Sequence, residues 1–270
     1  MRVAAYQAPY RPFPALGGAE LVAAHLDRAQ AEGGEIVCCP EALIGELANE
    51  SDGDSPATVA LSIVDGELNA ALAPLMGWNM TIVVGFTERG ADGQLHNAAA
   101  VISDSTVCGI YRKTYPGRSA CVAGAELPIF RHRDVPFGVR ICNDAHYIEP
   151  ARVLAANGAR PLVVPVHGGH RAEKEDAWRA RGTNVLVARA VENGVPLVAA
   201  DVAGWQGERV CHGTTTIIDS QGAVVAAARP LTQDFIVADV TLDGVRGGID
   251  GQLFGSANHT VTEQFLALWT

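Results

Sequence analysis

Short apolar runs alternate with stretches of helical spacing along the chain. The runs predict strands, because they are rich in Val, Ile and Ala and end near Gly, Pro or Asp. The expected strands span residues 2–7, 35–39, 80–86, 97–103, 105–111, 135–141, 162–166, 196–200, 214–218, 223–227 and 235–240. Apolar residues three and four apart predict helices over residues 17–32, 57–76, 151–159 and 173–192. Strands that alternate with helices in both halves of a chain predict a layered α/β fold rather than an all-β barrel.

The two halves of this pattern follow each other without a low-complexity linker. We therefore expect a single domain over residues 1–270. The tail over residues 247–270 is rich in glycine and polar residues, and we expect it to form a C-terminal arm.

Composition narrows the classes of partner. The chain has 270 residues, of which 48% are hydrophobic, so a large core is available. Its formal net charge of -10 argues against nucleic acid and against a membrane surface as partners, and it leaves a small-molecule substrate open. The six cysteines form no CxxC pair, so we expect neither a metal nor a cofactor. The N-terminal residues lack a signal-peptide pattern, and we expect a cytoplasmic protein with reduced thiols.

Cys142 directly follows the strand expected at residues 135–141. A side chain at that place points out of the sheet edge, and the backbone N–H after it can face a developing oxyanion. The thiol is therefore either a candidate nucleophile or a buried, inert cysteine. If it is the nucleophile, we expect Cys142 to be the only strongly reactive thiol of the chain.

Glu41 and Lys113 also stand at the ends of expected strands. In open α/β sheets, ligands and catalytic groups gather at these ends. Taken singly, each has an ordinary explanation. The acid is a helix cap or a solvated side chain, and the lysine is a solvated side chain. Together with Cys142 they supply a base, a cation and a thiol. Glu41 can take the thiol proton and Lys113 can stabilise the oxyanion, which is the chemistry of acyl transfer through a thioester.

Five blocks of the sequence resemble the nitrilase superfamily, the carbon-nitrogen hydrolases. CCPEALIGE resembles the block of the catalytic glutamate, LHNAAAVISDSTVCGIYRKTYP that of the lysine, and GVRICNDAHYIEPARVLAANGARPLVVP that of the cysteine. AVEN and HGTTTIIDSQGAVVA match two further blocks. The resemblance implies a four-layer αββα sandwich, a catalytic set of Glu41, Lys113 and Cys142, and pairing through a helical face into a homodimer.

One feature departs from the family pattern. Many members carry a second glutamate soon after the lysine, whereas residues 114–124 contain no acid. Glu126 lies just beyond and could replace it only if the loop folds differently. We therefore expect a pocket more positive than usual, which would favour a substrate that carries a carboxylate. Arg118 is either a contact for such a carboxylate or a solvated side chain.

Further residues lie where the family has pocket residues. Asn143 and Asp144 are expected to shape the turn after Cys142. His146 is expected either to line the pocket or to form a structural hydrogen bond, and His167 follows a strand where substrate contact is plausible. The expected substrate-binding residues are Asn143, His146, His167, Gly168 and Arg118.

Three functions remain open. The first is the hydrolysis of a C–N bond of a small linear amide, with a thioester intermediate. The second is that of a nitrilase or an N-carbamoyl amide hydrolase. Asn143 stands where nitrilases usually carry tryptophan, which favours the amidase. The third is a binding or assembly protein that keeps the fold but has lost efficient turnover, as the missing glutamate would suggest.

Overall fold

The computed structural model describes residues 1–11, 17–45, 47, 58–117 and 120–242. The expected arm at residues 247–270 and Arg118 lie outside the described residues. Within the described part of the chain, no helix has the length and apolar character that a membrane crossing needs.

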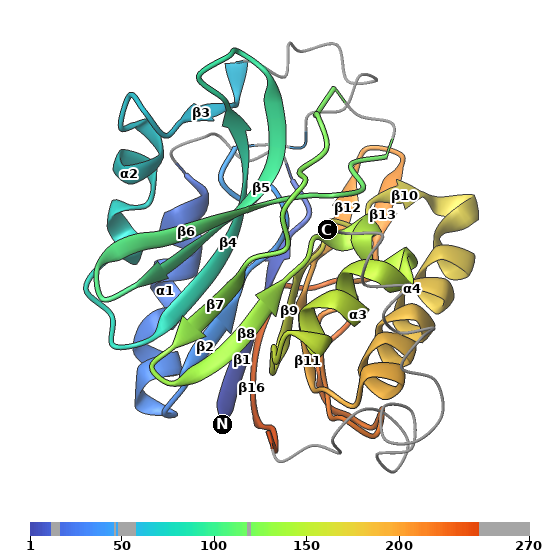
Figure 1. The fold of residues 1–270 in the computed structure, drawn as a ribbon. Helices are drawn as coiled ribbons and strands as arrows, with labels where there is room; N and C mark the ends of the chain where they lie inside the picture. Colours follow the sequence, from blue (N-terminus) through green and yellow to red (C-terminus); the bar gives the residue numbers. More distant parts are fainter. Residues whose placement is uncertain (12–16, 46, 48–57, 118–119, 243–270) are drawn as a thin grey trace.

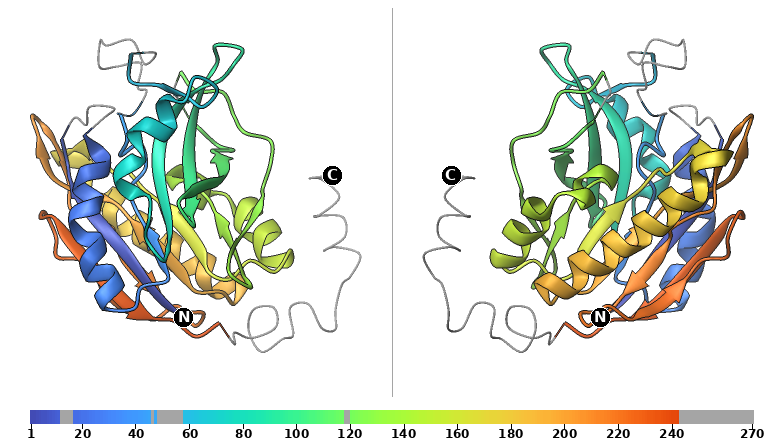
Figure 2. Two further views of the ribbon diagram at one scale, coloured as in Figure 1. Left: turned by 90° about the vertical axis from the view of Figure 1, so that its left-hand side faces the viewer. Right: turned by 90° about the vertical axis from the view of Figure 1, so that its right-hand side faces the viewer.

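The first of two sheets contains ten strands. They are β1 (Arg2–Pro9), β2 (Ile36–Cys38), β3 (Leu61–Ser62), β4 (Thr81–Arg89), β5 (Leu95–Ser103), β6 (Thr106–Arg112), β10 (His170–Arg171), β12 (Val202–Gln206), β13 (Arg209–Cys211) and β16 (Asp234–Asp239). Their order is β10-β13-β12-β1-β2-β4-β5-β6, with β3 beside β4 and β16 beside β1. Figure 2 shows the last of these strands, in red, along the first, in blue, and the two are antiparallel.

The second sheet contains six strands. They are β7 (Ile129–His132), β8 (Val135–Val139), β9 (Leu162–Pro165), β11 (Leu197–Ala200), β14 (Thr216–Ile218) and β15 (Val224–Ala227). Their order is β15-β14-β11-β9-β8-β7. The central strands β8, β9 and β11 are parallel, so their carboxyl ends lie at one edge of the sheet.

Helices cover the outer face of each sheet (Figure 1). They are α1 (Gly18–Ala31), α2 (Glu67–Ala71), the 3-10 helices η2 (Ala73–Leu75) and η3 (Cys142–His146), α3 (Ile148–Ala156) and α4 (Ala172–Asn193). One core cluster joins α1 and α2 to the first sheet, a second lies between the sheets, and a third joins the second sheet to α3 and α4. The four-layer αββα sandwich is therefore confirmed.

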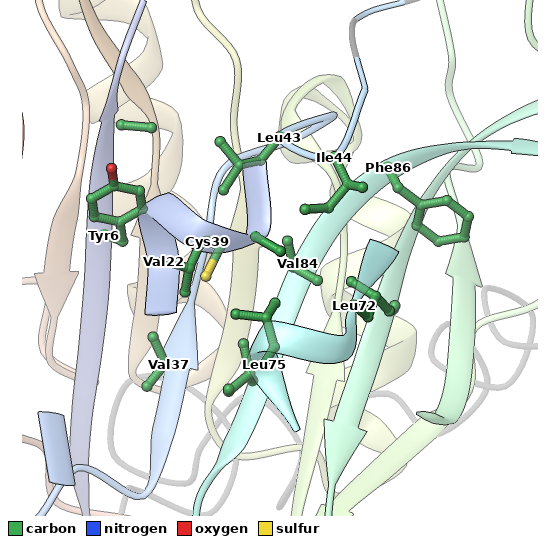
Figure 3. Packing of buried hydrophobic residues seen from close by; sticks show 14 of the residues in the cluster. Tyr6, Val22, Val37, Cys39, Leu43, Ile44, Leu72, Leu75, Val84 and Phe86 are labelled. Carbon is green, nitrogen blue, oxygen red and sulfur yellow. The ribbon is translucent and has the colours of Figure 1, made fainter. Parts of the chain in front are cut away.

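The helical spacing of α1 explains its contact with the first sheet. Val22, Leu26 and Ala29 lie on one face of the helix and are fully buried. Figure 3 shows Val22 together with Val37 of β2 and Leu75 of η2, which belong to the same cluster of buried side chains. The burial of this apolar stripe fixes the helix to the sheet.

Each of the expected strands is present, with ends that differ by a few residues, but the helix expected over residues 57–76 is wrong. Its described part contains β3, then the short α2, then η2. Gly66 has a φ of 78° just before α2, a conformation that does not continue a helix backwards. Pro74 lies in the first turn of η2, where its missing N–H separates η2 from α2.

Sequence patterns also missed four strands, β7, β10, β12 and β13. All are only two to five residues long, too short for an alternating or apolar pattern to identify them. The helix expected at residues 151–159 begins earlier, at Ile148, because Pro150 falls in the first turn, where a missing N–H costs little.

His132 forms a hydrogen bond between the two sheets, and its burial makes the stability of the protein depend on pH. It is 4% exposed at the end of β7, and its Nδ1 lies 2.8 Å from the hydroxyl of Thr81 on β4. Burial, followed by the charge of Arg133, lowers the pKa of His132. The folded protein thus keeps the ring neutral where the unfolded chain takes up a proton, below about pH 6.5.

The free energy of unfolding should therefore fall as pH falls from 7.5 to 5.5, by at most about 1.4 kcal/mol per pH unit for this one proton. In His132→Gln the bond to Thr81 can persist without a titrating ring, so urea unfolding should show a smaller loss over the same interval. The two proteins differ only at residue 132, so the difference between their losses of stability belongs to this histidine. Equal losses in the variant and the natural protein would contradict this assignment.

Candidate active site

Glu41 lies in a tight turn that follows β2. The residue after it, Ala42, has a φ of 48°, and Gly85 of β4 packs against the turn. A Cβ atom at Gly85 would lie 2.5 Å from the Cα of Glu41 and 2.6 Å from the carbonyl oxygen of Pro40. Only glycine fits at that approach, and the backbone N–H of Gly85 donates to the same Pro40 oxygen at 3.1 Å.

Lys113 and Glu41 form a buried ion pair. Lys113 Nζ donates to Glu41 Oε1 at 2.6 Å, and the two residues are 5% and 1% exposed. Asn97 of β5 donates from Nδ2 to the same oxygen at 2.7 Å. Glu41 Oε2 takes part in neither bond. Burial opposes the charge of Lys113, but Glu41 and then Cys142 and Asp144 raise the pKa of the lysine well above its usual value.

Cys142 is the first residue of η3 and has a φ of 42°, a conformation that residues other than glycine rarely adopt. Asp144 holds this turn, because its Oδ2 accepts the backbone N–H of Ile141 at 2.8 Å. Strained backbone of this kind is common where a side chain must be presented to a ligand. The turn follows β8 of the second sheet, whereas Glu41 and Lys113 follow strands of the first.

Asp144 also joins the segment of Cys142 to the segment of Lys113. It accepts hydrogen bonds from the hydroxyl groups of Tyr111 (2.7 Å) and Thr114 (3.1 Å), and from the backbone N–H of Tyr115 (2.8 Å). Asp144 is fully buried. Its carboxylate therefore fixes the loop after Lys113 directly against the turn of the cysteine.

The carboxylate of Asp144 also compensates for the glutamate that is missing after Lys113. The charge of Asp144 acts on Lys113, so the lysine has a second acid besides Glu41. Glu126, the other replacement considered, is exposed, and its charge acts on Arg112 instead. Asp144 thus supplies the negative charge whose expected absence near Lys113 was the basis for predicting a carboxylate substrate.

Glu41 and Lys113 both act on the thiol of Cys142. Burial and then the negative charge of Glu41 raise the pKa of this thiol, while Lys113 and a hydrogen bond from the backbone of His167 oppose the rise. A raised pKa favours the protonated thiol, so a role as nucleophile would require a base to take its proton. The structure thus brings the predicted base, cation and thiol into one site.

Two of the predicted substrate-binding residues, His167 and Gly168, lie in the loop after β9 at this site. Burial lowers the pKa of His167, although the charges of Glu41 and Asp201 act against the change. Gly168 donates its N–H to Asp201 at 2.9 Å. Asn143 donates from Nδ2 to the carbonyl oxygen of Tyr115 at 3.0 Å, so its side chain binds the loop after Lys113. Its backbone N–H belongs to the residue directly after Cys142.

His146 lies beside an aromatic cluster. Its ring meets the ring of Trp178 edge-on with centroids 6.4 Å apart, and Trp178 stacks on His170 at 4.8 Å. Burial and then the charges of Arg181, Arg189 and Lys113 lower the pKa of His146. Tyr147, the residue after His146, stacks on Tyr115 with ring centroids 3.7 Å apart.

Asn97 and Asp201 belong to this site but were not predicted from the sequence. Asn97 stands within a strand, where only the pairing of β4 with β5 aims its side chain at Glu41. Asp201 directly follows β11, so the rule that selected Glu41 and Lys113 at strand ends could have selected it as well.

A comparison with protein-family models identifies the chain's relatives. The model of the carbon-nitrogen hydrolases matches residues 2–249. The chain belongs to the carbon-nitrogen hydrolase family. The family expected from the five sequence blocks is thereby confirmed.

Among curated members of the carbon-nitrogen hydrolase family and its relatives, the protein named hydrolase in pqqF 5'region of Pseudomonas protegens is 28% identical, over 95% of this chain and 85% of its own. N-carbamoylputrescine amidase of Solanum tuberosum is 28% identical over 62% and 61% of the two chains. Glutamine-dependent NAD(+) synthetase of Thermotoga maritima is 26% identical over 61% of this chain and 29% of its own. The chain thus spans less than half the length of the synthetases that it matches.

Solved structures share the fold of this carbon-nitrogen hydrolase. A double mutant of the amidase from Nesterenkonia sp. AN1, in complex with acrylamide, superposes with a TM-score of 0.78 at 20% identity, over 98% of this chain and 97% of the amidase. A glutamine-dependent NAD+ synthetase from Acinetobacter baumannii superposes with a TM-score of 0.72 at 19% identity, over 88% and 45%. These likenesses confirm the mixed α/β fold.

Proposed function

We propose that the protein hydrolyses the C–N bond of a small linear amide, with Cys142 as nucleophile, Glu41 as general base and acid, and Lys113 as stabiliser of the oxyanion. The observation that supports this most is the buried bond of 2.6 Å between Lys113 and Glu41, both of which act on the thiol of Cys142. A base and a cation beside one sulfur are what acyl transfer to a thiol requires.

In the first half of the reaction, the Cys142 proton passes to Glu41 while the sulfur bonds to the carbonyl carbon of the amide. The carbonyl oxygen gains negative charge, which Lys113 and the N–H of Asn143 stabilise. The oxyanion then collapses, the C–N bond breaks, and Glu41 returns its proton to the departing nitrogen. The products of this half are an amine or ammonia and a thioester on Cys142.

In the second half, Glu41 takes a proton from water, and the resulting hydroxide adds to the thioester carbon. When the C–S bond breaks, the sulfur takes up the proton from Glu41 and a carboxylic acid leaves. Glu41 suits both halves because the bonds from Lys113 and Asn97 both fall on Oε1 and hold the carboxylate in place.

The other candidate functions differ in the bond that is attacked. Similarity to N-carbamoylputrescine amidase favours an N-carbamoyl compound as the second candidate. A nitrile is the third. A binding or assembly protein with weakened turnover has less support, because Asp144 supplies a second acid to Lys113 in spite of the missing loop glutamate.

Product release from a panel of substrates tests the proposal. We expect aliphatic amides to release ammonia and the carboxylic acid faster than nitriles or N-carbamoyl compounds of equal chain length. Acid quenching during turnover should leave a protein heavier by the acyl group, seen by intact mass spectrometry and lost in Cys142→Ala. Ammonia from every class without the acyl adduct would overturn the thioester mechanism, and no product from any class would favour the binding protein.

Two further expectations accompany this function. The homodimer implied by the family resemblance and the cytoplasmic location expected from the sequence both stay predictions. Likewise, contact between the substrate and His146, His167 or Gly168 is part of the proposal.

A further inference from the structure

The block AVEN, which forms the end of α4, has no part in the reaction proposed above. It comprises the last four residues of the helix, and Arg189 directly precedes it. Figure 1 shows α4 beside α3 on the outer side of the second sheet. The helix is in contact with η3, whose first residue is Cys142. A bond between the end of α4 and η3 therefore acts on the turn that carries the proposed nucleophile.

Arg189 makes this bond. Its Nε donates to the carbonyl oxygen of Ala145 at 2.9 Å, and the residue is 7% exposed. Ala145 belongs to the last turn of η3. The last carbonyl groups of a helix have no partner within it, and a buried carbonyl oxygen needs one. Arg189 thus satisfies the carboxyl end of the short helix that Cys142 begins.

Two residues of the AVEN block hold Arg189 in place. Glu192 accepts a bond at Oε1 from Nη1 of Arg189 at 2.6 Å, and Asn193 donates from Nδ2 to the backbone carbonyl oxygen of Arg189 at 2.9 Å. The donors of a guanidinium lie in one rigid plane, so the bond through Nη1 also fixes the direction of Nε. The carboxylate of Glu192 offsets part of the cost of burying the positive charge.

We propose that Arg189 is a positioning residue of the proposed hydrolase, which holds the turn of Cys142 against α4. Asp144 holds the other end of the turn, where its Oδ2 accepts the N–H of Ile141 at 2.8 Å. The φ of 42° at Cys142 persists only where surrounding contacts maintain it. The inference rests on the proposed function for its effect on turnover, whereas its effect on the turn requires no substrate.

The proposal predicts a loss of turnover rather than of substrate binding. Arg189 acts on the backbone of η3, and it does so from the side of α4. If the carboxyl end of η3 is released, the backbone at Cys142 can relax and carry the sulfur away from Glu41 and Lys113. Misplacement of a reacting group lowers the rate of the chemical step even where the substrate still binds.

Steady-state kinetics of three variants test this effect. Arg189→Met keeps a long apolar side chain but removes the donors, so kcat should fall about tenfold or more while KM changes by less than about twofold. Arg189→Lys can still donate to Ala145 and pair with Glu192, so it should recover most of the lost kcat. Glu192→Gln keeps the arginine but weakens its hold, so kcat should fall by a smaller factor.

Arg28→Met is the matched control. Arg28 also bonds a glutamate of its own helix, Glu32, at 2.6 Å, and a backbone carbonyl oxygen, that of Phe235, at 3.1 Å. These bonds join α1 to β16 of the first sheet, so this variant should keep its kcat. An unchanged kcat in Arg189→Met, an equal fall in the two methionine variants, or no recovery in Arg189→Lys would overturn the proposal.

Amide hydrogen exchange tests the turn in the absence of a substrate. The N–H of Asp144 donates to Ile141 at 2.9 Å, and the N–H of Tyr147 donates to Asp144 at 3.2 Å. Residues 141–147 should exchange several-fold faster in Arg189→Met than in the natural protein, and at the natural rate in Arg28→Met. Equal exchange in all three proteins would overturn the inference.

The exchange measurement separates this inference from the proposed function. If no amide is a substrate, the proposed function fails, but faster exchange in Arg189→Met still supports the hold on the turn. If Arg189→Met does not fold, Glu192→Gln supplies both measurements, with the same directions expected.

Discussion

Replacement of Glu41 by glutamine should reduce amide kcat/KM by a factor of about 10⁴, the upper range for loss of a general acid–base group. The amide oxygen of glutamine can still accept bonds from Lys113 and Asn97, but it cannot take the Cys142 proton. Loss of the acid also leaves Lys113 buried without its first counter-charge, so the free energy of unfolding should fall by about 3–5 kcal/mol. Steady-state kinetics and urea unfolding measure the two effects.

Glu88→Gln is the matched control for this variant. Glu88 is a second buried acid of the first sheet and is 2% exposed. It accepts two bonds, at 2.6 and 2.7 Å, from Arg112, the residue before Lys113. Its loss should lower stability while turnover stays within a few-fold of the natural protein. If both variants lose activity alike, the effect arises from disruption of the sheet. If Glu41→Gln keeps a tenth of the activity, Glu41 is not the base.

Gly85→Ala should impair stability and turnover together. The new methyl group would overlap the backbone of Pro40 and Glu41, which no side-chain rotation can relieve. Overpacking of this kind costs about 1–3 kcal/mol, and the displaced backbone carries Glu41, the proposed general base. We expect kcat to fall at least 10²-fold, since a displacement of about 1 Å at a reacting group has an effect of this size.

Gly182→Ala provides the comparison. Gly182 lies inside α4, and a Cβ atom there would meet its nearest neighbour, Thr214, at an ordinary 3.7 Å. This variant should be more stable by up to about 1 kcal/mol, because alanine favours the helix, and it should keep its turnover. A Gly85→Ala protein that behaves like Gly182→Ala would show that the turn of Glu41 can relax.

The three candidate catalytic residues could be selected from the sequence because each follows an apolar run. Cys142 stands directly after such a run, and Glu41 and Lys113 stand two residues after theirs. Parallel strands of an α/β fold bring their carboxyl ends to one edge. The long helices α1 and α4 were predictable for a similar reason, since many turns of apolar spacing leave little choice of structure.

The network that holds these residues was not predictable in the same way. Asn97 reaches Glu41 from 56 residues away, and Tyr115 reaches Asp144 from 29 residues away. Such contacts depend on strand register and on how the two sheets face each other, which local patterns do not specify. The helix prediction for residues 57–76 failed for a different reason. The apolar positions fit a helix, but Gly66 and Pro74 divide the segment into pieces too short for the pattern to identify.

Glu41, Lys113 and Cys142 come from two different sheets, and this arrangement has a mechanical consequence. The carboxylate and the ammonium belong to the first sheet and the sulfur to the second, and the apolar layer of Val83, Val139 and Val163 holds the sheets together. A slip of one sheet over the other would separate the sulfur from its base while every strand kept its own hydrogen bonds. Asp144 opposes that slip, because it is bonded to both sides. The alignment of the reacting atoms is therefore a property of the interface between the sheets, and neither sheet carries it alone.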